Sequence, residues 1–232
     1  MSEKVGLALL PGLLLDGALW RAQVESLSDI SDPWIADFTT QDSVTEMARS
    51  VLAAMPERFA LAGLSMGGYV ALEIMRQAPE RVTRLALLDT KARPDEPEIV
   101  ERDLMKLATI GEFKGVTPRL LPMLIHHDRL GEAALTGEIM AMAERIGRDA
   151  FLRQQQAILT RPDSRPTLAR ITCPTLVLCG RQDQLTPVEH HTEMAAGIAN
   201  ARLVVVDACG HLPPMEQPER CSNELRRWFT AE

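Results

Sequence analysis

The chain has 232 residues, of which 46% are hydrophobic and 25% are charged. This composition is typical of a globular protein, and the length is sufficient for one domain with a sizeable hydrophobic core. The formal net charge of −7 argues against a nucleic-acid or anionic-membrane surface, because both require clustered lysine and arginine.

Short apolar runs alternate with amphipathic segments along the chain. Strands are predicted at Val5–Leu10, Pro33–Phe38, Phe59–Leu64, Val82–Asp89, Thr175–Gly180 and Arg202–Asp207. Helices are predicted at Ala18–Leu27, Ser43–Ala54, Met66–Ala78, Pro187–Gly197 and Glu219–Phe229. This alternation is typical of βαβ units, so we expect an α/β fold with a predominantly parallel sheet flanked by helices.

The first apolar run imitates a secretion signal, because Lys4 precedes the stretch from Val5 to Leu15. Pro11-Gly12 interrupts this stretch and no clear small-residue cleavage pattern follows. We therefore interpret it as the first strand and its turn. None of the apolar runs approaches the roughly 20 residues that a membrane-spanning helix needs.

Four cysteines show neither a C-x-x-C pair nor a dense framework: Cys173, Cys179, Cys209 and Cys221. Cys173 and Cys179 flank one predicted strand, which places them about 20 Å apart, too far for a disulfide. The expected location is therefore a reducing cytoplasm.

The stretch from Arg93 to Arg165 has helical periodicity but no convincing strand, as in the segment 137–146. It predicts a helical cap at 93–165, inserted into a core domain formed by 1–92 and 166–232. Such a cap would lie over the carboxyl edge of the sheet, where open α/β sheets bind ligands. Its apolar residues indicate a mainly apolar pocket, among them Leu104, Met105, Leu120, Leu121, Met123 and Leu124. Its 11 basic and 12 acidic residues balance, so a strongly basic docking face for an acidic carrier protein is not evident.

Glycines enclose a serine in Gly63-Leu64-Ser65-Met66-Gly67-Gly68, directly between a predicted strand and a predicted helix. This is the G-x-S-x-G pattern of a nucleophile elbow, in which a strained turn lifts the hydroxyl above the sheet. A Cβ at Gly63 or Gly67 would collide with neighbouring backbone. A tight turn with a capping serine is the alternative. The position between strand and helix favours the nucleophile.

A serine hydroxyl needs a base to take its proton, and His211 is the candidate. It follows the strand that ends at Asp207, so it lies at the same sheet edge as Ser65. The other histidines form the doublets His126-His127 and His190-His191, which we interpret as solvated or packing residues. Adjacent residues do not share a helix face, and no ligand triad is visible, so we predict no metal site.

The base needs a carboxylate that orients it, and Asp183 leaves the preceding strand at the same edge. The order Ser65, Asp183, His211 is the order associated with this elbow. Asp89, at the end of the strand Val82–Asp89, is the rival acid, whereas Asp207 is interpreted as a turn cap. Cys209 would permit a thiol mechanism but has no elbow of its own.

Two backbone N–H groups should stabilise the oxyanion. Met66 N–H directly follows the nucleophile, and the loop after the first strand supplies the second donor, with Leu13 as the best candidate. Losing one such donor typically costs about 2.7–4 kcal/mol in the transition state, so this loop matters as much as the triad.

Together these residues resemble the α/β-hydrolase superfamily, specifically its small members with a helical cap. The likeness covers nearly the whole chain and rests on four motifs in register: the LPG loop, GLSMGG, PTLVLCGRQDQLTP and DACGHLPPMEQPE. The resemblance implies a Ser65–His211–Asp183 triad with Leu13 and Met66 at the oxyanion hole. It also implies about six strands, with Pro33–Phe38 at an exposed edge. Many relatives carry His-Gly where Pro11-Gly12 stands here.

The leading hypothesis is hydrolysis of a small, mainly apolar carboxylic ester or thioester through an acyl-enzyme, with no cofactor and no metal. The expected partner is a small ester-like substrate, with neither nucleic acid nor membrane. The superfamily also hosts lyases and C–C bond hydrolases that use the same constellation, and related folds serve as ligand receptors with little turnover. Both alternatives remain open from the sequence.

Overall fold

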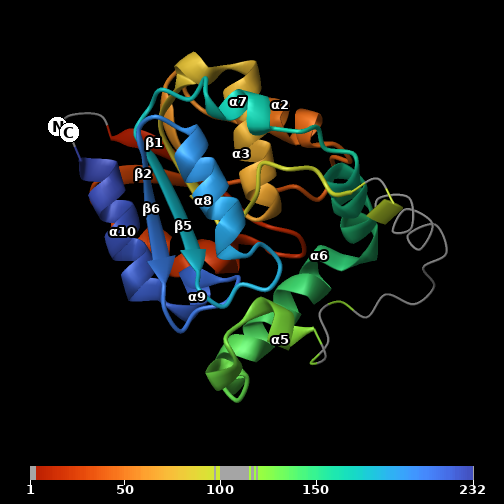
Figure 1. The fold of residues 1–232 in the computed structure, drawn as a ribbon. Coiled ribbons are helices and arrows are strands. Elements are labelled where there is room, and N and C mark those ends of the chain that lie inside the picture. Colours follow the sequence, from red (N-terminus) through yellow and green to blue (C-terminus); the bar gives the residue numbers. More distant parts are fainter. Residues whose placement is uncertain (1–3, 97, 100–114, 116–117, 119, 232) are drawn as a thin grey trace.

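The computed structural model describes residues 4–96, 98–99, 115, 118 and 120–231. At its centre lies a six-stranded sheet with the order β2-β1-β3-β4-β5-β6, and every neighbouring pair is parallel (Figure 1). The strands are β1 (Val5–Leu10), β2 (Ser31–Ile35), β3 (Phe59–Leu64), β4 (Val82–Leu88), β5 (Thr175–Gly180) and β6 (Ala201–Val206). The predicted α/β fold with a six-stranded parallel sheet is confirmed.

Helices cover both faces of the sheet, as a parallel sheet requires. One face packs against α2 (Val44–Ala54), α3 (Met66–Gln77), α7 (Arg165–Leu168) and α8 (Val188–Gly197). The other face packs against α1 (Arg21–Leu27) and α10 (Pro218–Thr230). The short α5 (Leu121–Leu124) and α6 (Ala133–Leu159) contribute apolar side chains to the same core from beyond the sheet. The remaining short helices are α9 (Pro213–Glu216), η1 (Gly17–Trp20), η2 (Pro79–Arg81) and η3 (His127–Arg129).

Burial on both faces explains why the strands are nearly uninterrupted apolar runs. All six residues of β3 are buried, and they alternate between the two cores. Leu61 packs with α2 and α3, while Ala62 packs on the α10 side. Burying a leucine fully contributes about 1.5–3 kcal/mol, so the continuous apolar pattern stabilises the central strands far more than any surface contact.

The second strand lies earlier than the sequence predicted, at Ser31–Ile35 rather than Pro33–Phe38. Its ladder with β1 begins at the Val5–Ser31 pair and extends to an N–H bond from Ala36 to the carbonyl of Leu9 at 3.1 Å. Phe38 follows the strand and packs into the core beside α2, so its apolar side chain does not mark a residue of the sheet. As expected, β2 lies at the edge of the sheet. Pro33 has no N–H to donate, and an edge strand tolerates this loss.

Between β4 and β5 the chain leaves the sheet, and α5 and α6 project to one side of the helix–sheet–helix sandwich (Figure 1). The periodic segment 137–146 is helical, as predicted, within α6. Gly147 interrupts this helix with φ 75° and ψ 176°. Parts of the predicted cap, including Leu104 and Met105, lie outside the described residues. Among the helices that are described, none is long and apolar enough to cross a membrane.

Candidate active site

Ser65 occupies a strained turn between β3 and α3. Its φ of 55° and ψ of −117° lie in a region that non-glycine residues rarely adopt. The Ser65 N–H donates to the Leu88 carbonyl at 3.0 Å, which fixes the turn to β4. A Cβ at Gly63 would collide with the backbone of Gly67, and one at Gly67 would collide with the Leu10 carbonyl. The predicted need for both glycines is confirmed.

The sheet order explains why the turn is open to a ligand. The chain order of the strands reverses between β1 and β3, so the loops after these two strands diverge. Such a switch point leaves a crevice at the carboxyl ends of the strands. Ser65 follows β3 and Leu13 follows β1, so both residues lie at this crevice.

His211 and Asp183 form a buried pair. His211 Nδ1 lies 2.8 Å from Asp183 Oδ2, and because a carboxylate only accepts hydrogen bonds, Nδ1 carries the proton. Asp183 also accepts from Thr186 Oγ1 at 2.5 Å and from the N–H groups of Leu185 and Thr186 at 2.8 and 3.1 Å. Burial alone would raise the pKa of Asp183. The opposite charge and hydrogen bond of His211, with the Thr186 bonds, outweigh it and hold that pKa well below its usual range.

The loop that carries His211 is held by Glu216, a residue that the sequence analysis did not single out. Its carboxylate accepts from the N–H groups of Gly210 and Leu212, on either side of His211, at 2.9 and 3.2 Å. It also accepts from the His126 N–H at 2.6 Å. Glu216 is almost fully buried, so these three bonds satisfy a charge that would otherwise be costly. The sequence feature that could have indicated its role is the acidic Glu216 directly after the apolar residues Pro-Pro-Met.

Asp89, the rival acid, does not take the place of Asp183. One oxygen accepts from the Gly180 N–H at 2.9 Å, and the other has no hydrogen-bond partner in the described part of the chain. Ligand atoms of Asp89, Asp183 and His211 lie within 4.8 Å of one another. Complete burial raises the pKa of Asp89 well above its usual range. The nearby Asp183 charge raises it further, against the Gly180 bond. Burial and the adjacent negative charge therefore favour the protonated form of Asp89 beside an ionised Asp183.

The two predicted oxyanion donors belong to different elements. Met66 is the first residue of α3, and the first N–H groups of a helix have no acceptor within the helix. Leu13 lies on the loop after β1 and lines the same cavity as Ser65. The loop is fixed from α6 by Gln154, which accepts from the Leu14 N–H at 3.0 Å and was also missed in the sequence.

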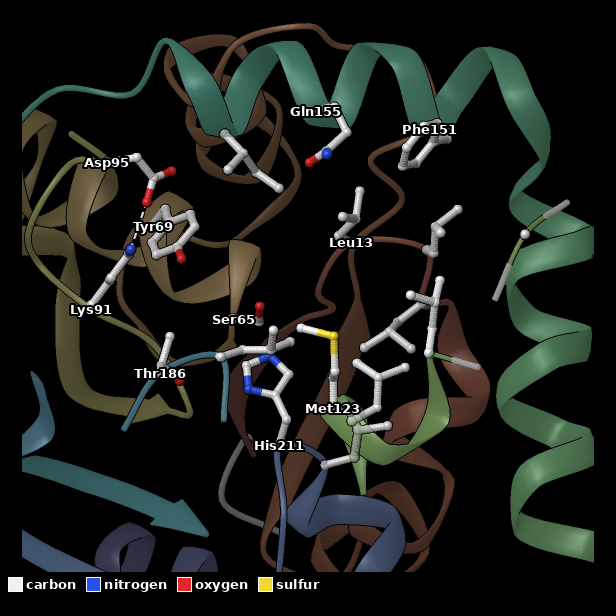
Figure 2. A pocket seen from close by; sticks show the side chains of 18 residues that line it. Leu13, Ser65, Tyr69, Lys91, Asp95, Met123, Phe151, Gln155, Thr186 and His211 are labelled. Carbon is white, nitrogen blue, oxygen red and sulfur yellow. Dashed lines mark hydrogen bonds and ion pairs between the residues drawn. The ribbon is translucent and has the colours of Figure 1, made fainter. Parts of the chain in front are cut away.

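Ser65 and His211 line a cavity of about 530 Å³ (Figure 2). Its wall is mostly apolar, and among the predicted cap residues it includes Leu120, Met123 and Leu124. Leu121, predicted beside them, is instead buried in the core. The apolar pocket inferred from the cap composition is thus present in the described residues.

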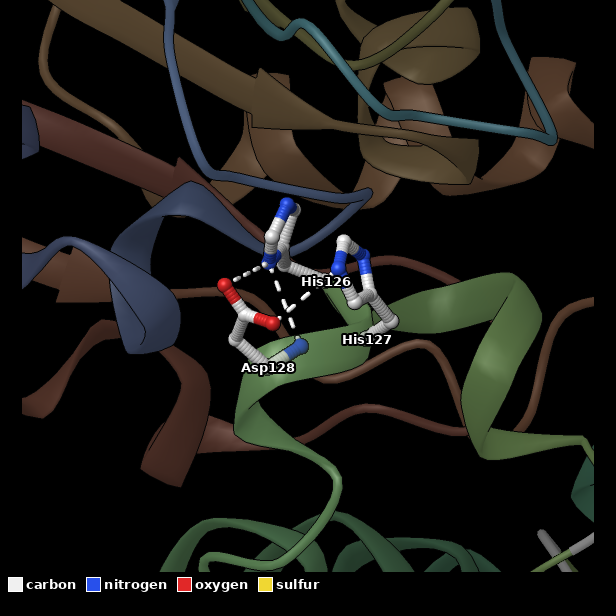
Figure 3. Close-up of side chains that lie close together, drawn as sticks. All are labelled: His126, His127 and Asp128. Carbon is white, nitrogen blue, oxygen red and sulfur yellow. Dashed lines mark hydrogen bonds and ion pairs between the residues drawn. The ribbon is translucent and has the colours of Figure 1, made fainter.

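His191 and the His126–His127 doublet have structural partners. Buried His191 accepts from the Thr90 N–H at 3.0 Å, and burial lowers its pKa to about 4. His126, His127 and Asp128 form a small cluster at the start of η3 (Figure 3). The Nδ1 of His126 already accepts from the Asp128 N–H at 3.3 Å, so this nitrogen is engaged within the turn.

All four cysteines are free thiols. Cys209, two residues before His211, is fully buried, and burial raises its pKa far above the usual range. A thiol with such a pKa is not a nucleophile at neutral pH. The structure therefore gives no support to the thiol alternative.

Residues 9–224 match the model of the alpha/beta hydrolase family. The chain is 29% identical to the pimeloyl-[acyl-carrier protein] methyl ester esterase of Nitrosomonas europaea, over 92% of this chain and 91% of that relative. It is 27% identical to the 2-hydroxy-6-oxononadienedioate/2-hydroxy-6-oxononatrienedioate hydrolase of Paraburkholderia xenovorans, over 82% and 68%. Among solved structures, a thermophilic esterase from Thermogutta terrifontis with malate bound superposes with a TM-score of 0.87. The two chains are 31% identical, and the match spans 97% of this chain and 89% of the esterase chain.

Proposed function

This chain belongs to the alpha/beta hydrolase family, and on that premise we propose that it is a carboxylic ester hydrolase with a Ser65–His211–Asp183 triad. Its substrate is a small ester or thioester with a mainly apolar acyl chain. The observation that carries the proposal is the 2.8 Å bond from His211 to Asp183, on a histidine that shares one cavity with a strained Ser65. Two esterases, one known by sequence and one by structure, resemble nearly the whole chain.

The proposed reaction proceeds in two halves. His211 Nε2 takes the proton of Ser65 while the serine oxygen attacks the ester carbonyl, and a tetrahedral oxyanion forms. The N–H groups of Leu13 and Met66 donate to this oxyanion. His211 then gives the proton to the departing alcohol, leaving an acyl-enzyme. Water, deprotonated by His211, attacks the acyl group and releases the carboxylic acid, which restores Ser65.

Asp183 supports this cycle electrostatically. It holds the proton on Nδ1 of His211, so that Nε2 is the free base, and it stabilises the imidazolium that forms. The lowered pKa of Asp183 keeps it ionised through the cycle. Its four hydrogen bonds also fix the carboxylate in one orientation.

The test is turnover of p-nitrophenyl butyrate. Ser65→Ala and His211→Ala should each lower kcat by about three to six orders of magnitude, because triad members act as a unit. Ser50→Ala is the matched control, since Ser50 bonds only within α2. It should keep wild-type turnover. Equal hydrolysis by wild type and Ser65→Ala would contradict the proposal.

The same assay separates the alternatives. A lyase would be inert toward the chromogenic ester, and a C–C bond hydrolase would turn over its ketone substrate faster than the ester. A ligand receptor would release at most one equivalent of nitrophenol. A linear release over many equivalents that depends on Ser65 is the outcome that the ester-hydrolase proposal requires.

We further propose a cytoplasmic location, on the ground that all four thiols are unpaired. The net charge of −7 favours neither nucleic acid nor an anionic membrane as partner. The Nitrosomonas relative is named for a carrier-protein substrate, but the segment 93–165 of this chain has no excess of basic residues that would favour an acidic carrier protein.

A further inference from the structure

The cavity above Ser65 has two unlike sides. Met123 and Phe151 lie on one side of Ser65, whereas Tyr69, Lys91 and Asp95 lie on the other side (Figure 2). The cavity wall in the described residues is otherwise almost free of charged groups, apart from His211. Placing a charged side chain in an apolar cavity costs desolvation free energy unless the charge has a partner or binds a ligand.

The charges on the polar side do not cancel. Asp95 Oδ1 lies 2.6 Å from Lys91 Nζ, and Oδ2 lies 2.9 Å from an Arg161 nitrogen. Two cations therefore share one carboxylate, and both of its oxygens are engaged. Burial alone would raise the pKa of Asp95, but the two cations outweigh it and lower the pKa to about 2, so Asp95 remains ionised. The three side chains together carry one net positive charge.

Lys91 is the cation that remains available to a ligand. Arg161 is only 3% exposed and its guanidinium also donates to the carbonyls of Arg93 and Ile158. Lys91 is 17% exposed, lines the cavity, and has Asp95 as its partner within the described chain. An ammonium has three N–H donors, so two donors of Lys91 remain beyond the one used by Asp95.

Tyr69 supplies a second donor beside it. The Arg161 guanidinium lies 4.2 Å from the centre of the Tyr69 ring, which fixes the ring against the charged cluster. The Tyr69 hydroxyl has no hydrogen-bond partner among the described residues, although it lines the cavity. Burial raises the pKa of Tyr69 to about 12, so the hydroxyl keeps its proton and donates.

We propose that Lys91 and Tyr69 form an anion-binding subsite that receives a second, free carboxylate of the substrate. The preferred substrates are then half-esters of dicarboxylic acids, with the ester carbonyl at Ser65 and the free carboxylate at Lys91. A carboxylate suits this subsite because it accepts several hydrogen bonds, and charge-assisted bonds are strong where water is excluded. This inference rests on the proposed ester hydrolysis and narrows its substrate class.

The test compares matched pairs of substrates. Monomethyl succinate, glutarate, adipate and pimelate are each paired with the neutral methyl ester of the monocarboxylic acid of equal chain length. Acid release is followed with a pH indicator, and the readout is the ratio of kcat/KM for the half-ester to kcat/KM for its neutral partner. The wild-type ratio should exceed unity for at least one chain length, the one that spans from Ser65 to Lys91.

Lys91→Met should lower that ratio about 10- to 100-fold, mainly through KM of the half-ester, because a charge-assisted hydrogen bond is lost. Lys91→Arg, which keeps the charge, should restore part of it, and Tyr69→Phe should lower it by a smaller factor. Lys4→Met is the matched control, since Lys4 lies on the surface far from the cavity and bonds to the Ser28 carbonyl. It should leave the ratio unchanged.

A second measurement needs no variant. Succinate, glutarate, adipate and pimelate should inhibit wild-type hydrolysis of a neutral ester competitively, and more strongly than the monocarboxylic acids of equal length. Ratios that do not change in Lys91→Met, or dicarboxylates that inhibit no better than monocarboxylates, would overturn the subsite. In either case hydrolysis of the neutral ester by the wild type, lost in Ser65→Ala, shows that the proposed function still holds.

Discussion

Replacing Asp89 by asparagine should stabilise the protein at neutral pH. The carboxyl group is completely buried, has one hydrogen bond from Gly180, and lies close to the ionised Asp183. The pKa of this carboxyl group is raised in the folded protein, so ionisation of Asp89 opposes folding. Asparagine keeps the acceptor for Gly180, is neutral at every pH, and presents an N–H donor toward Asp183.

The pH dependence of the free energy of unfolding follows from the difference between the folded and unfolded pKa of Asp89. A raised folded pKa gives stability that is complete below the unfolded pKa of about 3.9 and is lost as pH rises toward the folded pKa. Each pKa unit is worth about 1.4 kcal/mol. Asp89→Asn should therefore equal wild type near pH 4 and become the more stable protein as pH rises, by at most about 4 kcal/mol at neutral pH, because the interval between about 3.9 and neutrality sets that limit.

The assay is urea unfolding of wild type and variant from about pH 4 to neutrality, with the midpoint and slope measured at each pH. Asp183→Asn is the matched comparison with the opposite sign. Its lowered folded pKa gives stability that is present above the unfolded pKa and lost as pH falls. Asp183→Asn should thus be the less stable protein throughout the range from about pH 4 to neutrality, and it should approach wild type only below the unfolded pKa of about 3.9. An Asp89→Asn protein that is destabilised equally at every pH would refute the reasoning.

Four further outcomes are expected. Gly67→Ala should destabilise the fold by about 2–4 kcal/mol in urea unfolding, because its Cβ would meet a strand carbonyl. Gly137→Ala, where the Cβ meets nothing within 4 Å, should instead stabilise α6 by about 0.5–1 kcal/mol. Iodoacetamide should leave ester hydrolysis intact, since buried Cys209 is a protonated thiol; loss of activity on its alkylation would revive a thiol mechanism. Arg145→Ala should change the free energy of unfolding by less than about 1 kcal/mol. Arg145 lies 2.7 Å from Asp16, but its side chain is 48% exposed, and ion pairs exposed to solvent contribute little stability. A larger loss of stability would contradict this.

Local pattern was sufficient for much of the fold. The limits of β1, β3 and β5 agree with the prediction because each is an apolar run ended by a glycine or a turn. The elbow was predictable because the collisions at Gly63 and Gly67 are dictated by backbone geometry. The limits of β2 were wrong because Phe38 has a core side chain outside the ladder, and periodicity does not distinguish these cases.

The supporting residues of the site were not predictable in the same way. Glu216 accepts a hydrogen bond from the Gly210 N–H across a turn, and Gln154 accepts one from the Leu14 N–H, which is distant in the sequence. No residue spacing in the sequence predicts such bonds. The cluster of Lys91, Asp95 and Arg161 joins residues on either side of the segment 93–165. Their meeting depends on how α6 returns to the sheet, which is a tertiary property.

The most direct test of the central claim is the intact mass of the protein after treatment with an organophosphonate probe. The account predicts a single adduct on the wild-type chain, mapped by peptide sequencing to Ser65, absent in Ser65→Ala and formed far more slowly in His211→Ala. A wild-type protein that stays unlabelled, or an adduct on another residue that persists in Ser65→Ala, would contradict an activated serine at this site.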